Sequence, residues 1–127
     1  MRLFLRLART RLGRWLTGWI FTHMRDLLPI DRLAETGTLI AFRHPQPAYS
    51  FHVLIVPKKE IASLEMLDPA DSVFLADLYV TVQGLVKQFD LGVNGYRLIV
   101  NGGKFQDFPY LHFHLVGATL ESPPRED

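Results

Sequence analysis

The sequence predicts an α+β fold in which an antiparallel sheet carries one long helix, with an additional helix at the N-terminus. Three observations support this fold: short apolar runs between proline- and glycine-rich turns, one long segment with helical periodicity, and a basic amphipathic segment at the start. With 127 residues, 48% of them hydrophobic and 21% charged, the chain is long enough for one globular domain with its own core. We expect this domain at residues 20–118, preceded by the N-terminal helix at 1–19 and followed by a polar tail at 119–127.

Four runs rich in β-branched and aromatic residues predict the strands of the sheet. They lie at residues 38–42, 51–56, 96–100 and 110–116, and each is bounded by proline, glycine or asparagine. The loop after the first run, His44-Pro45-Gln46-Pro47-Ala48, is rich in residues that break regular structure.

The long helix is predicted between Asp68 and Gly92. Asp68 is suited to the N-cap, Pro69 to the first helical position and Asp71 to the first turn, while Gly92 stands just past the expected end. The apolar residues between them recur at helical spacing and predict a stripe that packs on the core: Phe74, Leu78, Val82, Leu85 and Phe89.

Residues 1–19 contain five arginines and no acid, interspersed with leucine and with Trp15 and Trp19. The arginines interrupt the apolar residues too often for a transmembrane span of about 20 residues or a secretory signal with an apolar stretch of roughly 7–15 residues. One interpretation is a helix that lies on an anionic membrane surface. The other is a helix that packs on the domain or on a second subunit, with a frayed extension as a third. A short helix at 20–28, ended by Pro29, is expected to follow.

The charge balance restricts the class of partner. The net charge of the chain is +1 and residues 1–19 carry +5, so the remainder carries −4. A mildly acidic body argues against nucleic acid as the main partner. The absence of cysteine excludes disulfides, zinc fingers and a cysteine nucleophile. The expected location is the cytoplasm, with peripheral membrane contact if residues 1–19 bind a membrane.

The most informative segment is Tyr110-Leu111-His112-Phe113-His114-Leu115-Val116-Gly117. Strand alternation puts His112 and His114 on one face and the apolar residues between them on the other. Two adjacent imidazoles suit phosphate chemistry or a metal. Spacing alone leaves three interpretations open: ordinary strand histidines, a metal site, or a catalytic pair. The metal site would need a third ligand, for which His52 is the candidate by strand register.

Further polar residues are expected to converge on this pair. Asn101-Gly102-Gly103 ends the third predicted strand, and its glycines allow positive φ and close approach of backbone amides to a ligand. If the third and fourth strands are neighbours, this loop lies at the same sheet edge as the histidines. We therefore expect an anion pocket, with His112, His114 and Asn101 as the catalytic candidates. The candidates for substrate binding are His44, His52, Gly102, Gly103, Gln106, Asp107 and Tyr110.

The segment 110–117 resembles the signature of the histidine-triad (HIT) family, His-φ-His-φ-His-φ-φ, where φ is apolar. Residues 51–59 resemble the family's histidine-bearing strand that ends in Pro-Lys, and 91–101 resemble its helix end, turn and strand ending in asparagine. The resemblance covers about residues 20–118, with the elements in the family's order.

This resemblance implies a homodimer that hydrolyses or transfers nucleotidyl groups, with a small nucleotide or phosphorylated molecule as the substrate. It implies His112 as the nucleophile that forms a nucleotidyl-histidine, His114 as a contact of the phosphate or leaving group, Asn101 as part of the phosphate site and His52 as a support. It implies neither a metal held by the triad nor a cofactor.

Three positions depart from the family pattern. Tyr110 replaces the first histidine, His44 stands where nucleotide-binding members place an acid for the ribose hydroxyls, and Asp107 stands where many have a small hydroxyl residue. A carboxylate beside a phosphate repels it unless it is turned away or paired. Two outcomes are compatible with these changes: a hydrolase or transferase with altered preference, or a weakly active or inactive module that binds nucleotides or anions.

Overall fold

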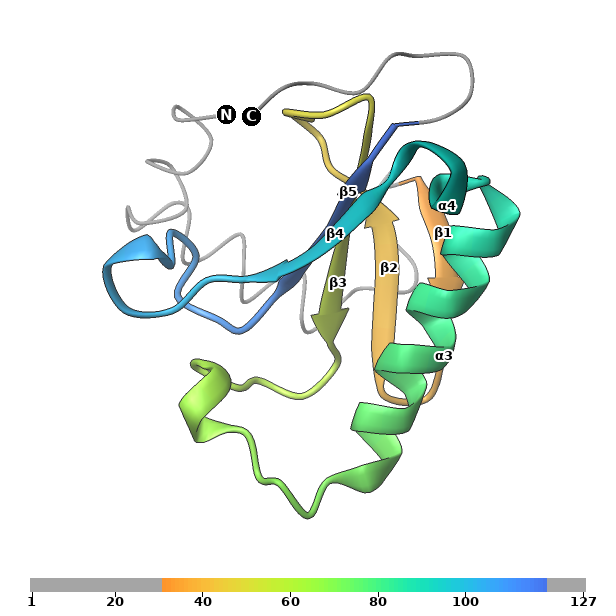
Figure 1. The fold of residues 1–127 in the computed structure, drawn as a ribbon. Helices are drawn as coiled ribbons and strands as arrows, with labels where there is room; N and C mark the ends of the chain where they lie inside the picture. The colour runs from red at the N-terminus through yellow and green to blue at the C-terminus, as the bar shows by residue number, and fades with distance from the viewer. Residues whose placement is uncertain (1–30, 119–127) are drawn as a thin grey trace.

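A computed structural model of the chain describes residues 31–118 and shows an α+β fold with one five-stranded sheet (Figure 1). The strands follow the order β1-β2-β3-β5-β4, and every neighbouring pair is antiparallel. The strand bounds are β1 Arg32–Glu35, β2 Leu39–Arg43, β3 Phe51–Pro57, β4 Tyr96–Val100 and β5 Phe113–Gly117. The predicted fold class is confirmed.

Two differences from the predicted strands have local causes. β1 was not predicted, because its Arg-Leu-Ala-Glu sequence is a short, partly exposed edge strand with little apolar signal. β5 begins at Phe113 instead of at residue 110. The N–H of Leu111 donates to the carbonyl of Ile61 (2.7 Å), so this lead-in segment pairs with a loop and not with the sheet.

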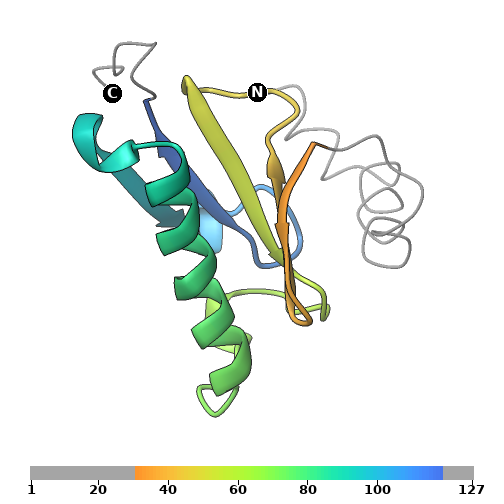
Figure 2. The same ribbon diagram turned by 90° about the vertical axis from the view of Figure 1, so that its right-hand side faces the viewer.

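The long helix α3, Ser72–Gln88, packs on one face of the sheet (Figures 1 and 2). Its N-cap is Asp71, whose side chain accepts from the N–H of Phe74 (3.2 Å). The prediction of Asp68 as the N-cap and Pro69 as the first helical residue is wrong. Asp68 instead accepts from the N–H of Ala70 (2.9 Å) in the preceding turn, which uses the same side-chain chemistry outside the helix.

The end of the helix also differs from the prediction. α3 stops at Gln88, Asp90 adopts a left-handed φ of 53°, and a second short helix, α4 Leu91–Asn94, follows. Gly92 lies inside α4, and Gly95, with φ 98°, is the residue that ends it. Two 3₁₀ turns complete the described fold: η1 Leu64–Met66 and η2 Gly103–Phe105.

The two faces of the sheet carry different side chains. The face toward α3 carries the main core, to which Phe113 and Leu115 of β5 and the preceding Leu111 contribute. The opposite face carries a smaller apolar cluster of Ile40, Phe42, Leu54 and Val56. His114 of β5 and His112, which precedes this strand, belong to the second face, as strand alternation predicts.

The predictions for residues 1–19, 20–28 and 119–127 lie outside the described residues. Between residues 31 and 118, none of the helices has the length and apolar character that crossing a membrane requires.

Candidate functional site

All four histidines within residues 31–118 gather on the face of the sheet opposite α3. His52 is in β3, His114 is in β5, His112 precedes β5 and His44 follows β2. Their exposed fractions are 4% for His44, 3% for His52, 7% for His112 and 6% for His114. We call these four residues the histidine cluster. The sheet brings together side chains that are up to 70 positions apart in the sequence.

Strand pairing explains the arrangement. β3 pairs with β5 so that His52 lies opposite Val116 and Leu54 opposite His114. The N–H of His44 donates to the carbonyl of His52 (2.8 Å), which extends the β2–β3 ladder by one residue. The ring centroids are consequently close: 4.4 Å for His44–His52, 5.2 Å for His52–His114 and 5.0 Å for His112–His114.

His112 is oriented by the backbone of the preceding segment. Its Nδ1 lies 2.9 Å from the carbonyl oxygen of Tyr110. A carbonyl can only accept, so Nδ1 carries the proton and donates. The Nε2 atom of the neutral ring therefore keeps its lone pair, which is the state that a nucleophilic histidine needs. The Phe108 ring meets His112 edge-on at a centroid distance of 5.3 Å.

His52 and His114 belong to one hydrogen-bond chain. The backbone N–H of Ala48 donates to His52 Nδ1 (3.0 Å), and His52 Nε2 lies 2.9 Å from His114 Nδ1. Because His52 Nδ1 accepts, the proton of this ring is on Nε2 and is donated to His114. The proton of the neutral His114 ring is then on its Nε2.

Burial keeps the cluster uncharged near neutral pH. Burial, reinforced by the other imidazoles, lowers the pKa of His44 to about 4 and that of His114 to about 3. Burial lowers the pKa of His52 to about 4. Burial also lowers the pKa of His112, and the Tyr110 carbonyl and the Asp107 carboxylate oppose this shift in part. The site is therefore a set of neutral donors and acceptors and not a cationic patch.

The loop after β4 brings some of the other predicted residues to the same end of the sheet. Asn101 is half-buried and directly follows Val100, which pairs with Phe113, so Asn101 lies at the edge where His112 precedes β5. Asp107 is close enough to raise the pKa of His112 against the effect of burial. Gly103 has the left-handed φ of 57° that its residue type permits, whereas Gly102 has an ordinary extended φ of −135°.

Two predicted residues have structural contacts in this arrangement. Gln106 Nε2 donates to the carbonyls of Ala62 (2.7 Å) and Phe108 (3.0 Å), which braces the loop against the segment after β3. Tyr110 contributes the backbone carbonyl that orients His112, a group that any residue at this position provides. The involvement of both side chains in substrate binding stays a prediction.

The sequence analysis missed the backbone groups of the site. The amides of Gln46 and Ala48 and the carbonyl of Tyr110 each bind a ring nitrogen of the cluster. The sequence also predicted His112, His114 and His52 as the three ligands of a possible metal site. Among the described residues the structure instead groups His44, His52 and His114, each with one ring nitrogen within 4.8 Å of the others.

Comparisons with known proteins agree with this architecture. The profile of the HIT domain matches residues 28–120. An uncharacterized HIT-like protein of Synechococcus elongatus is 34% identical over 104 residues, which is 80% of this chain and 90% of that protein. A HIT family hydrolase from Legionella pneumophila superposes with a TM-score of 0.71 at 29% identity, covering 84% of this chain and 95% of the other.

A second solved structure has a name that includes a ligand. The histidine triad nucleotide-binding protein from Candida albicans superposes with a TM-score of 0.69 at 28% identity, covering 88% of this chain and 80% of the other. The profile match spans most of the chain and includes β5 and all four histidines of the cluster. The chain therefore belongs to the HIT domain family.

Proposed function

We propose that this protein hydrolyses or transfers the phosphoryl group of a nucleotide-type substrate through a covalent intermediate on His112. The observation that carries the proposal is the hydrogen bond from His112 Nδ1 to the Tyr110 carbonyl. It fixes the ring in the tautomer that leaves Nε2 free to attack, in a cluster whose burial keeps the ring neutral.

The chemistry then has two balanced steps. The lone pair of His112 Nε2 forms a bond to phosphorus as the bond from phosphorus to the leaving group breaks. The neutral His114 donates an Nε2–H hydrogen bond to the leaving group and keeps its proton, and the leaving group takes a proton from solvent. The ring becomes a cationic phospho-imidazole, which the Tyr110 carbonyl stabilises at Nδ1–H. Water or another acceptor then attacks phosphorus and loses its proton to solvent as the bond from phosphorus to Nε2 breaks, which restores the neutral His112.

His52 supports His114 in this scheme. Its Nε2–H bond to His114 Nδ1 holds the donor proton of His114 on the opposite nitrogen. The proposed nucleotide class follows the name of the Candida albicans structure and the family resemblance. Asn101, at the same edge of the sheet, is proposed to bind a phosphoryl oxygen.

The test is turnover of nucleoside phosphoramidates and dinucleoside polyphosphates by the full chain and by His112→Ala. We expect loss of turnover in the variant, together with a nucleotidyl adduct in the wild type after rapid quenching and mass spectrometry. Nuclear magnetic resonance of the adduct should place phosphorus on Nε2, because Nδ1 is bound to Tyr110. Equal turnover by both proteins would overturn the proposal. Thermal stabilisation by nucleotides without turnover would instead support the binding module.

A further inference from the structure

The loop between β2 and β3 directs two backbone N–H groups at the histidine cluster. The N–H of Gln46 donates to His44 Nδ1 (2.9 Å), and the N–H of Ala48 donates to His52 Nδ1 (3.0 Å). An imidazolium has no acceptor nitrogen, so each ring that accepts such a bond is neutral. The ring proton is therefore on Nε2 in both residues.

The loop sequence explains why these two amides act together. In Pro45-Gln46-Pro47-Ala48 the prolines have no N–H, so residues 46 and 48 are the two donors of this stretch. Each of the two amides donates its hydrogen bond to an imidazole and not to a backbone carbonyl of a turn or a strand. The prolines also restrict the backbone on either side of Gln46, which limits the loss of entropy when the amides are held in place.

The effect of the Ala48 amide extends beyond the ring that it binds. Since His52 must carry its proton on Nε2, it donates to His114 Nδ1 (2.9 Å), and His114 must carry its own proton on Nε2. The amide of Ala48 thus determines the tautomer of two rings, His52 and His114. If the Ala48 donor were absent, the chain could reverse: His114 Nδ1–H would donate to His52 Nε2, and His114 Nε2 would become an acceptor.

We propose that the backbone amides of Gln46 and Ala48 are positioning groups that hold His44, His52 and His114 in the Nε2–H tautomer. In this state the cluster presents fixed Nε2–H hydrogen-bond donors, and it cannot bind a divalent metal ion through the Nε2 atoms of His44 and His52.

The spacing of the three rings would suit a metal ion, so the predicted exclusion of a metal can be tested by experiment. One nitrogen from each of His44, His52 and His114 lies within 4.8 Å of the others, which a small shift could bring around a transition-metal ion. Metal-bound histidines almost always donate their other ring N–H to an acceptor. Here the other nitrogens face amide N–H donors, so a metal at Nε2 of His44 or His52 would set two N–H groups against each other.

The first experiment uses the wild-type protein. Long-range ¹H–¹⁵N correlation spectra of the imidazoles at pH 7 report which ring nitrogen carries the proton. We expect the Nε2–H tautomer for His44, His52 and His114, and the Nδ1–H tautomer for His112 as an internal contrast. An Nδ1–H tautomer for His44 or His52 would overturn the inference regardless of any activity.

The second experiment removes each amide. Ala48→Pro and Gln46→Pro delete the donors, while Ala48→Gly and Gln46→Ala keep them and serve as matched controls. Circular dichroism and thermal unfolding show which variants fold, and the wild-type spectra decide the inference if a proline variant does not. In Ala48→Pro we expect mixed tautomers at His52 and His114; wild-type tautomers in a folded Ala48→Pro would count against the inference.

The metal readout is isothermal titration of the tag-free proteins with zinc chloride. We expect no stoichiometric binding to the wild type or the controls, and a gain of binding in the double variant Gln46→Pro, Ala48→Pro. Stoichiometric zinc in the wild type that is lost in His44→Gln would overturn the inference. So would a folded double variant that binds no more zinc than its controls.

The kinetic readout rests on the proposed function, whereas the tautomer and zinc readouts do not. In Ala48→Pro we expect kcat to fall by about tenfold or more, because removing one preorganised hydrogen-bond donor from a transition state costs about 10²–10³. KM should stay close to that of Ala48→Gly. A folded Ala48→Pro with wild-type kcat would contradict the positioning role, while absence of turnover in the wild type would contradict only the proposed function.

Discussion

The carbonyl oxygen of Tyr110 lies 2.9 Å from Nδ1 of His112, so the backbone of one residue orients the ring of the next histidine along the strand face. The side chain at position 110, a tyrosine here, does not affect this bond, because the carbonyl belongs to the backbone. We therefore expect the tyrosine to affect the proposed nucleophile, His112, less than the comparison with the family signature suggests.

A first prediction distinguishes the role of the Tyr110 carbonyl from the role of its hydroxyl. Tyr110→Phe should change kcat/KM by less than about threefold, which corresponds to under about 0.7 kcal/mol in the barrier. Steady-state kinetics on a nucleoside phosphoramidate measures this. A loss comparable to that of His112→Ala would mean that the hydroxyl itself takes part in the reaction.

The role of His114 as a hydrogen-bond donor predicts a dependence on the leaving group. His114→Ala should lower kcat by about 10²-fold for amine or alkoxide leaving groups, on which negative charge develops in the transition state, in line with the loss of one preorganised donor. A nitrophenolate delocalises this charge, so its release should slow far less. His112→Ala is the matched control, and it should slow both substrates alike. Equal losses for both leaving groups in His114→Ala would exclude the donor role.

The buried histidines predict that stability falls as the pH is lowered. In the folded state the pKa of His52 is about 4, below its ordinary value of 6.5, so between these pH values the unfolded state binds more protons. The free energy of unfolding should be highest above pH 6.5 and decrease as the pH falls toward 4. Since one pKa unit corresponds to about 1.4 kcal/mol, His52 contributes on the order of 2–3 kcal/mol to this decrease.

Urea unfolding at pH 7.5 and pH 4.5 measures the decrease in the wild type and in His52→Gln. The carboxylates titrate in both proteins. The difference between the two proteins in the loss of unfolding free energy from pH 7.5 to pH 4.5 therefore isolates the contribution of His52. The variant should lose less stability than the wild type over this interval. Equal losses would show that His52 does not resist protonation in the folded state.

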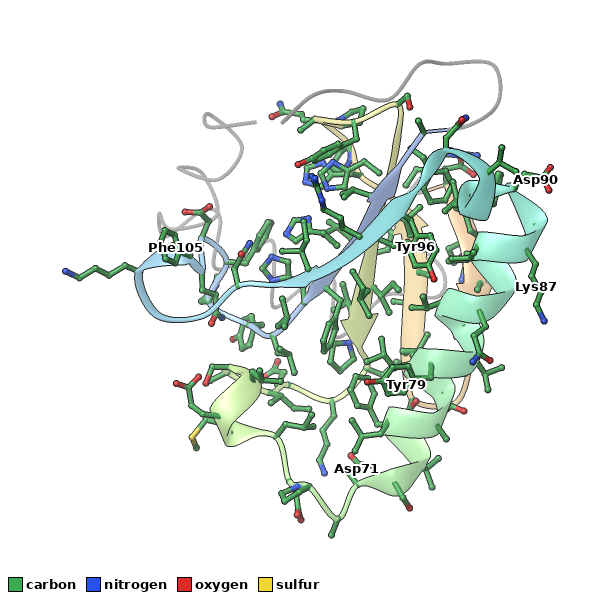
Figure 3. All side chains as sticks on the ribbon, in the orientation of Figure 1. Asp71, Tyr79, Lys87, Asp90, Tyr96 and Phe105 are labelled. Carbon is green, nitrogen blue, oxygen red and sulfur yellow. The ribbon has the colours of Figure 1, made fainter. Side chains whose placement is uncertain are left out.

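A further prediction concerns the homodimer that the family resemblance implies. Within residues 31–118, β4 is an edge strand of the sheet, and its Tyr96 is 49% exposed. Tyr79 and Val80 of α3 are also exposed, by 61% and 66%. Figure 3 shows Tyr79 on α3 and Tyr96 on β4. A sheet edge and exposed apolar groups are both features that a second copy of the chain could cover. Analytical ultracentrifugation should show a dimer.

The matched variants for this prediction are Tyr79→Lys and Phe105→Lys. Phe105 is 80% exposed but belongs to the loop after β4, away from α3 (Figure 3). Tyr79→Lys should shift the protein toward monomer, since it places a charge in the apolar surface, and Phe105→Lys should leave the dimer intact. A monomeric wild type, or equal behaviour of the two variants, would contradict the proposed interface.

The sequence by itself determined the faces of the sheet. The alternation from Tyr110 to Gly117 assigned Leu111, Phe113 and Leu115 to the core and His112 with His114 to the other face, because side chains on a strand alternate with a period of two. The helix stripe from Phe74 to Leu85 followed in the same way from its periodicity. Choosing between Asp68 and Asp71 as the cap was beyond the sequence, because both side chains suit a helix start.

Only the tertiary structure decided which nitrogen of each histidine ring carries the proton. The antiparallel register of β2 and β3 brings His44 onto His52, and the folded loop aims the amides of Gln46 and Ala48 at their Nδ1 atoms. Residue types show that imidazoles are present, but the position of each ring proton depends on which donor or acceptor faces each nitrogen. Those donors and acceptors reach the rings only when distant parts of the backbone pack together. Their positions distinguish a set of Nε2–H donors from a metal site built on His44, His52 and His114.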